Sequence, residues 1–215
     1  CLELAMARPA DAIEVAQNWL AAAKTMKERA GARQCQAMAL TRIDGWAEAA
    51  VLFLAAREDT PANEGAERAR LAALGGNAHL AAGDPAAALA ALDLARSDAR
   101  DGADSALKGL IEIDRARALV ALGRLPEAAA ALDDAREFVP RSAQAWLLSA
   151  TLSRRMGNLA QAQQQIERAA ELMPVDPGVG FEAGVMAVLA GRVEAARGSW
   201  QAVIRAAPNS PAAKT

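Results

Sequence analysis

The stretch AQAWLLSATLSRRMGNLAQAQQQIERAAELMPVD, residues 143–176, decides the fold of this chain. Apolar and small residues recur at helical spacing on both sides of Met156-Gly157-Asn158, which predicts two amphipathic helices joined by a tight turn. Gly157 suits the end of the first helix, and the second helix should end before Pro174, which has no backbone N–H. We therefore expect a helical hairpin.

The same pattern recurs along the whole chain. A large residue of the second helix comes back at steps of 34, 39, 40, 34 and 34 residues. These large residues are Trp19, Phe53, Leu92, Leu132, Ile166 and Trp200. Four positions before them stand Val15, Ala49, Ala88, Ala128, Ala162 and Ala196, on the same helical face. Small residues there let neighbouring helices approach closely, and the turns between repeated helices carry Gly83, Gly123, Gly157 and Gly191.

A large apolar residue, a turn glycine, two small residues and a closing proline in this order resemble the tetratricopeptide (TPR) repeat. The resemblance implies an all-α fold, a right-handed superhelix (α-solenoid) of about six TPR-like helix-turn-helix repeats, in one domain over residues 1–215. The expected repeats are a divergent cap at 1–29, then 30–63, 69–102, 109–142, 143–176 and 177–210. Extra residues near 59–65 and 99–105 should lengthen connections or add a turn to the next first helix.

Composition agrees with a helical chain that has a real core. The sequence is 53% hydrophobic, 23% charged and 3% aromatic, which is too apolar for a disordered chain. A net charge of −2 gives no general attraction to nucleic acid or anionic membrane, and no apolar run reaches the roughly twenty residues that span a bilayer. Arg greatly outnumbers Lys and Ala is abundant, which resembles the protein of a bacterium with a GC-rich genome.

Residues that could support catalysis are scarce, so we predict a protein that is not an enzyme and needs no cofactor. The sole histidine, His79, lies on an expected first helix and is interpreted as a packed ring. Asp133 and Asp134 are adjacent and so diverge on a helix. The glycines of 178–184 follow a helix end, whereas a dinucleotide-binding loop follows a buried strand. The spacing of Cys1, Cys35 and His79 does not predict a metal site.

The two cysteines leave two readings open. Cys1 and Cys35 occupy equivalent positions of neighbouring repeats, which favours a disulfide in an oxidising compartment. Stacked helices, however, lie about 8–10 Å apart, whereas a disulfide needs Cα atoms within about 7 Å. A twist at the terminal repeat could close that gap.

The TPR resemblance further implies a groove lined by the first helices, which binds an extended peptide or a helix of a partner protein. Helical spacing places Gln34 on this inner face, among other residues. The selected partner-binding residues are Arg70, Asn77, Arg117, Leu147, Thr151, Arg154, Arg155 and Phe181. Because four of these are arginines, the groove is predicted to prefer acidic partners. Each residue could equally belong to an ordinary solvated surface.

Other functions remain as alternatives. A helical-repeat nucleic-acid binder would need base-reading polar pairs and a basic chain, which this sequence lacks. A clamp for a terminal carboxylate would need Lys and Asn partners in adjacent repeats, which are missing here. The chain could also be the TPR region of a larger enzyme.

Both ends of the chain suggest further expectations. The start at Cys1 without Met and the paired cysteines favour a periplasmic or exported protein over a cytoplasmic one. At the other end, the helix expected over 193–206 carries Trp200, Val203 and Ile204, and only a short tail follows it. Part of this apolar surface should be exposed, which predicts a homodimer through the C-terminal repeat, or a capping segment that has been removed.

Overall fold

The computed structural model describes residues 1–100 and 102–214. Asp101 and Thr215, which belong to an expected insertion and to the tail, lie outside the described residues. Helical hairpins follow one another along the described chain, and no strand occurs in it. The all-α helical-repeat fold is therefore confirmed.

The chain divides into two compact units, an N-terminal unit of Cys1–Arg124 and a C-terminal unit of Leu125–Thr215. The N-terminal unit contains α1 (Leu2–Ala7), α2 (Pro9–Ala22), α3 (Met26–Thr41), α4 (Trp46–Glu58), α5 (Gly65–Ala81), α6 (Pro85–Asp98) and α7 (Ser105–Ala121). The C-terminal unit contains α8 (Leu125–Phe138), α9 (Ala143–Arg155), α10 (Leu159–Leu172), α11 (Pro177–Leu189), α12 (Val193–Ala206) and α13 (Pro211–Lys214). The single domain expected over 1–215 stays a prediction.

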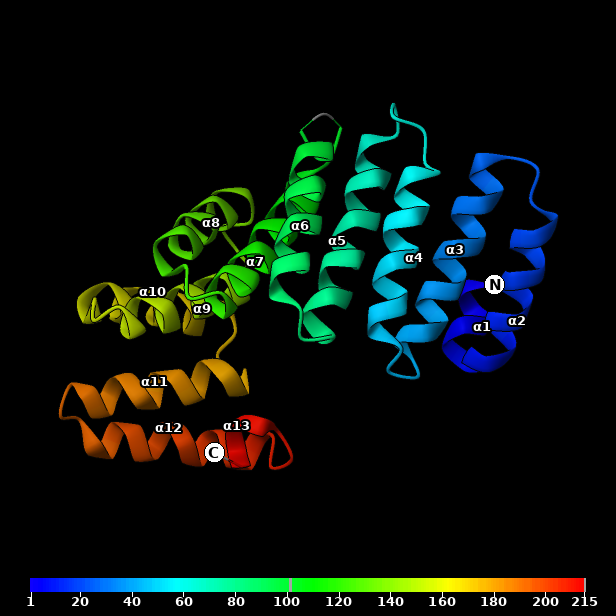
Figure 1. Ribbon diagram of the computed structural model, residues 1–215. Coiled ribbons are helices and arrows are strands. Elements are labelled where there is room, and N and C mark those ends of the chain that lie inside the picture. The colour runs from blue at the N-terminus through cyan, green and yellow to red at the C-terminus, as the bar shows by residue number, and fades with distance from the viewer. Residues whose placement is uncertain (101, 215) are drawn as a thin grey trace. The chain divides into compact units, whose positions relative to one another are not determined.

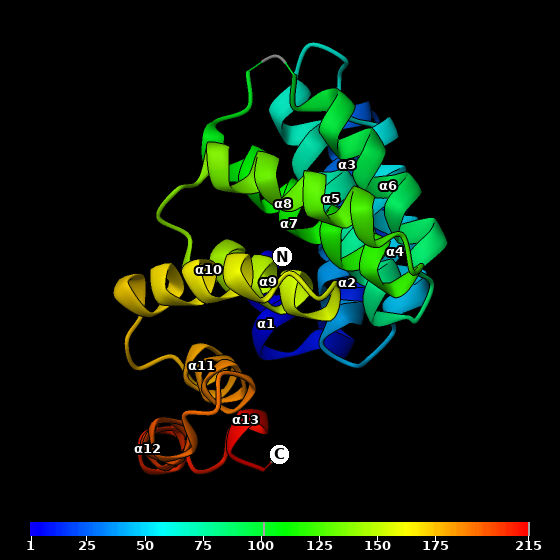
Figure 2. The same cartoon turned by 90° about the vertical axis from the view of Figure 1, so that its left-hand side faces the viewer.

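Within each unit, a helix packs mainly against the next one along the chain. In the N-terminal unit α3, α4, α5 and α6 lie side by side (Figure 1). In the C-terminal unit α11 and α12 form an antiparallel hairpin, and the short α13 contacts both of them (Figure 2). The odd-numbered helices α3, α5, α7, α9 and α11 are the first helices of the expected repeats, and the even-numbered helices that follow them are the second helices.

The turns inside the hairpins have the geometry that the glycines predict. Gly83, Gly123, Gly157 and Gly191 all have φ between 72° and 82°, the left-handed region that an L side chain rarely adopts. Asp44 takes this conformation in the turn between α3 and α4, with φ of 59°. Within each unit, tight turns of this kind keep the two helices of a hairpin antiparallel and in contact.

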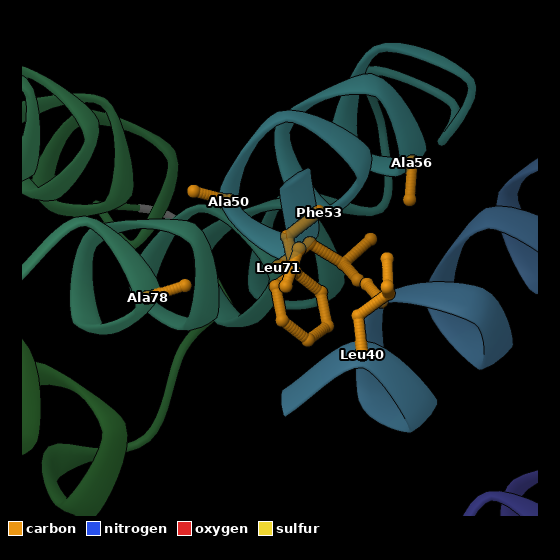
Figure 3. Packing of buried hydrophobic residues seen from close by; sticks show 8 residues of the cluster. Leu40, Ala50, Phe53, Ala56, Leu71 and Ala78 are labelled. Carbon is orange, nitrogen blue, oxygen red and sulfur yellow. The ribbon is translucent and has the colours of Figure 1, made fainter. Parts of the chain in front are cut away.

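Four of the six large residues of the second helices are buried in the core. Phe53 of α4 is buried and points toward Leu40 of α3 and Leu71 of α5 (Figure 3). Leu92, Leu132 and Ile166 are buried in the same way. The small residues before them, Ala49, Ala88, Ala128, Ala162 and Ala196, are no more than 1% exposed.

In repeats two to six, the large residue has a small counterpart sixteen positions earlier, on the first helix. A Cβ atom added to Gly76 would lie 2.6 Å from Leu92 Cγ, and one added to Gly184 would lie 2.0 Å from Trp200 Nε1. The equivalent positions in the other repeats hold Ala37, Ala116 and Ala150, which are all buried. Within each unit, close approach of the two helices of a hairpin therefore depends on small residues in both of them.

The extra residues near 59–65 and 99–105 mainly lengthen first helices. α5 and α7 have 17 residues each, whereas α9 and α11 have 13. The additional length is close to one helical turn of about 3.6 residues.

The register expected for the first repeat is wrong. Val15 is 46% exposed and Trp19 is 37% exposed, whereas Ala12 and Ala16 are fully buried. The buried face of α2 thus lies three residues earlier than expected, and the indole of Trp19 packs over Gly31 of α3. A small residue therefore fills the position that a large residue fills in later repeats.

Cys1 and Cys35 form a disulfide, with Cα atoms 5.9 Å apart. Cys1 precedes α1 instead of lying within a stacked helix, so the usual spacing between helix axes does not keep it from Cys35. Cys35 is fully buried among Ala5, Ala12 and Ala16. The bridge therefore fastens the start of the chain to the middle of α3.

The C-terminal surface differs from the expectation in one respect. Val203 is 5% exposed and packs against Gly180 of α11, where an added Cβ atom would lie 2.5 Å from Val203 Cγ2. Val203 therefore belongs to the interior of the last hairpin, and it cannot serve as a surface contact. Ile204, beside it on α12, is 52% exposed.

Candidate functional site

A pocket opens between the first helices α3 and α5. Its volume is about 150 Å³. The residues that line this α3–α5 pocket are Lys27, Ala30, Gly31, Gln34, Thr60, Pro61, Glu64, Glu67 and Leu71. Its floor includes the buried side chain of Leu71, and charged side chains of Lys27, Glu64 and Glu67 surround it. The pocket thus offers an apolar interior with both signs of charge around it.

One wall of this pocket comes from the connection between α4 and α5, where the chain carries extra residues. The hydroxyl of Thr60 donates to the carbonyl of Ala56, at 2.9 Å. Arg68 Nη1 donates to the carbonyl oxygens of Arg57 and Thr60, each at 2.9 Å. These hydrogen bonds hold the connection that forms this wall of the pocket.

Ion pairs link α3 to the end of α4, and α4 to α6. Arg29 and Arg33 of α3 pair with Asp59, which follows α4 and is buried. Arg57 of α4 donates to Asp98 of α6 with two nitrogens, at 2.6 and 3.1 Å. Charged pairs with several hydrogen bonds are directional, so they define the spacing between these helices.

The expected groove residues of the N-terminal unit are engaged within the protein. Arg70 donates to Glu67 at 2.5 and 2.7 Å, on the same helix. Asn77 of α5 donates to Asp114 of α7 at 2.7 Å, and Arg117 donates to the same carboxylate at 2.9 Å. Burial raises the pKa of Asp114, although the hydrogen bonds from Asn77 and Arg117 oppose this rise. Asn77 and Arg117 therefore meet at Asp114, away from the α3–α5 pocket lining.

In the C-terminal unit, Arg154 of α9 donates to Glu182 of α11 at 2.6 and 3.2 Å. These hydrogen bonds raise the pKa of Arg154, which stays charged. Glu182 is only 4% exposed, so the pair is an internal link between two first helices. Arg155 is exposed at the end of α9.

The remaining candidates of the C-terminal unit are half-buried. Leu147 packs close to Gly178, whose added Cβ atom would lie 3.1 Å from Leu147 Cδ2. Thr151 lies one turn further along α9. The ring centroid of Phe181 lies 6.5 Å from that of Trp200, and Trp200 Nε1 donates to the Phe181 carbonyl at 3.1 Å. Phe181 is thus part of the packing between α11 and α12.

Three of the four selected arginines form ion pairs within their own unit, and the preference of the groove for acidic partners stays a prediction. Arg70, Arg117 and Arg154 each have a carboxylate partner in the chain. The spacing of three residues from Glu67 to Arg70, and from Asp114 to Arg117, could have indicated two of these pairs. No local signal links Arg154 to Glu182, which is 28 residues away.

Comparison with known proteins now gives the class of the fold. No family model matches the chain, and no curated protein matches it. Among solved structures, YrrB, described as a TPR protein with an unusual peptide-binding site, is 19% identical, with a TM-score of 0.62 over 94% of this chain and 97% of that one. TTC0263, a TPR protein of Thermus thermophilus, is 18% identical, with a TM-score of 0.64 over 84% of this chain and 93% of its own. BtubC from P. vanneervenii is 16% identical, with a TM-score of 0.74 over 96% of this chain and 91% of its own.

These similarities establish a TPR-like fold, as the spacing of the sequence predicted. Helices of the described residues are all too short or too polar to cross a membrane.

Proposed function

We propose that this protein is a non-catalytic interaction scaffold that binds a peptide segment of a partner protein along its first helices. The observation that carries the proposal is the α3–α5 pocket, which lies between two first helices and has a volume of about 150 Å³. Such a space suits one apolar side chain, with Leu71 and Ala30 beside it. Gln34 can hydrogen-bond the backbone of an extended peptide. YrrB, which has a similar fold, is described as having a peptide-binding site.

A selection from a displayed library of random peptides tests this proposal. Peptides enriched on the wild-type chain should bind the Ala30→Arg variant at least about tenfold more weakly, because the new side chain fills the pocket. Ala90→Arg is the matched control, since Ala90 is exposed on the second helix α6 of the same unit. Equal affinities of both variants, or no enriched peptide, would refute the proposed site. An oligonucleotide library run in parallel tests the nucleic-acid alternative.

A preference for acidic partners is a further part of the proposal, and Arg155 is the residue that tests it. Changing Arg154 would leave Glu182 buried without its partner, so a loss of binding could reflect damage to the fold. Arg155 is exposed, and reversal of its charge should weaken binding of acidic peptides and reduce their salt dependence. If charge reversal at Arg155 leaves affinity and salt dependence unchanged, the proposed preference for acidic partners is refuted.

We also propose that the protein works in an oxidising compartment, the periplasm or outside the cell. The disulfide between Cys1 and Cys35 supports this, because reducing compartments keep thiols reduced. Fractionation of cells that express the full gene should recover the protein outside the cytosol. Recovery in the cytosol alone would contradict the proposal.

We further propose that the protein forms a homodimer through the last hairpin, α11 and α12. Val188, Leu189, Val193 and Ile204 of α11 and α12 are between 44% and 56% exposed, which is much apolar surface for one hairpin. The homodimer is tested by a substitution of the exposed Ile204, because Val203 is buried within the chain.

A further inference from the structure

A second pocket lies among α8, α9 and α10, within the C-terminal unit. Its volume is about 60 Å³, and its lining comes from all three helices. The lining residues of this α8–α10 pocket are Ala129, Leu132, Asp133, Ser149, Leu152, Ser153, Met156, Asn158, Gln161 and Gln165. None of them is a predicted groove residue, and none contributes to the α3–α5 pocket. The α8–α10 pocket is therefore a separate feature of the fold.

Gln165 is the unusual residue of this pocket. It is only 4% exposed, and its Oε1 is the one fully buried side-chain nitrogen or oxygen among the described residues that has no hydrogen-bond partner. A buried carbonyl oxygen without a donor is costly, and folded proteins keep few of them. Because Gln165 lines the pocket, a group placed there can supply the missing donor.

Two neighbouring side chains of the lining, Ser149 and Asp133, offer acceptors. Ser149 commits its proton to the carbonyl of Ala145, at 2.8 Å, so the lone pairs of its hydroxyl oxygen can accept. Asp133 adds a carboxylate whose side chain is 63% exposed and shared with Arg136. The lining contains one acidic residue and no basic residue. The side-chain amides of Asn158 and Gln161 can also donate, but the one unpaired buried atom is an acceptor and the one charged residue of the lining is acidic, so a positively charged donor complements this pocket.

A primary ammonium group has this chemistry, with three N–H donors and no acceptor. It is compact, whereas a guanidinium group is planar and larger. A volume of about 60 Å³ equals roughly two water molecules, enough for an ammonium group and a methylene. Leu132, Leu152 and Met156 supply an apolar wall for the methylene groups that follow.

We propose that the α8–α10 pocket binds the ammonium end of a lysine side chain from a partner polypeptide. The inference does not rest on the α3–α5 pocket, because it concerns other helices and another chemistry. Gln165 Oε1 and Ser149 Oγ accept from the ammonium group, and Asp133 attracts its charge. Leu132 and Met156 contact the stem.

The test titrates the wild-type chain with Nα-acetyl-lysine methylamide and with n-butylammonium, followed by NMR of the backbone and of the Gln165 side-chain amide. Both should bind saturably, with Kd of about 1–10 mM for groups of this size. 1-Butanol, a neutral compound of similar shape, should bind at least about tenfold more weakly. Equal binding of 1-butanol would overturn the proposal. Tighter binding of putrescine than of the lysine amide would overturn the assignment to a polypeptide.

Two variants locate the binding at Gln165. Gln165→Met keeps the length of the side chain and removes the acceptor, so butylammonium should lose at least about tenfold in affinity while the unfolding midpoint does not fall. Gln165→Glu should bind it at least about tenfold more tightly. Gln164→Met, at an exposed position of α10, is the control and should bind like wild type. Wild-type affinity in both Gln165 variants would refute the site.

Discussion

The contact between Gly184 and Trp200 allows a sharp test of how the helices approach each other. A Cβ atom at Gly184 would lie 2.0 Å from Trp200 Nε1 and 2.5 Å from its Cδ1, so Gly184→Ala must displace the indole ring. The displacement also breaks the hydrogen bond from Trp200 to the Phe181 carbonyl, now 3.1 Å long. Overpacking costs about 1–3 kcal/mol and the lost hydrogen bond about 1 kcal/mol.

Alanine is about 1 kcal/mol more favourable than glycine in a helix, which offsets part of that cost. We therefore expect Gly184→Ala to destabilise the chain by about 2 kcal/mol and to lower the midpoint of thermal unfolding by roughly 4–8 °C. Gly198→Ala on α12 is the matched control, because an added Cβ atom there meets no atom within 4 Å. It should stabilise the chain by about 0.5–1 kcal/mol.

Urea unfolding followed by circular dichroism measures both variants against wild type. The two changes should move the midpoint in opposite directions. If Gly184→Ala is as stable as Gly198→Ala, the close approach of α11 and α12 is not limited by the indole ring, and the small-residue rule inferred from Gly76 and Gly184 fails.

Three further predictions concern the disulfide, a buried carboxylate and self-association. The Cys1–Cys35 bridge closes a loop with a sequence separation of 34, so Cys1→Ala should lower stability by about 3–4 kcal/mol in urea unfolding, and a loss near zero would contradict this. The pKa of Asp114 is raised in the folded chain, so the folded state binds this proton more tightly than the unfolded state does. The free energy of unfolding therefore falls as pH rises above 3.8. Asp114→Asn should therefore gain stability relative to wild type between pH 4 and pH 7, and a constant difference would refute this reasoning. Sedimentation should show that the wild-type chain is a dimer and that Ile204→Glu weakens it. A wild-type chain that stays monomeric at high concentration would contradict the predicted self-association.

Much of the fold could be predicted because it depends on local spacing. The turn glycines and the recurring large residues can be read directly, and Phe53 and Ile166 are buried as expected. The first repeat was misread because Trp19 is large and lies at the right interval, although Ala16 fills the core position. Residue size identifies the core position only where the repeat is regular.

The candidate sites were harder to predict because they depend on contacts between helices. Gln34 was placed on the inner face by helical spacing, but its pocket also needs the connection after α4. The role of Glu182 depends on Arg154, which lies on another helix. Gln165 looks like one of several glutamines on an amphipathic helix, and only its burial among three helices distinguishes it.

The claim that the α3–α5 pocket binds peptide is tested most directly by photo-crosslinking. p-Benzoylphenylalanine placed at Gln34, which lines the pocket, is compared with the same group at Ala90, exposed on α6. Each variant is irradiated with a peptide selected on the wild-type chain, and adducts are measured by mass spectrometry. A peptide adduct is expected at position 34 and none at position 90. Equal adducts at both positions, or an adduct at position 90 alone, would contradict it.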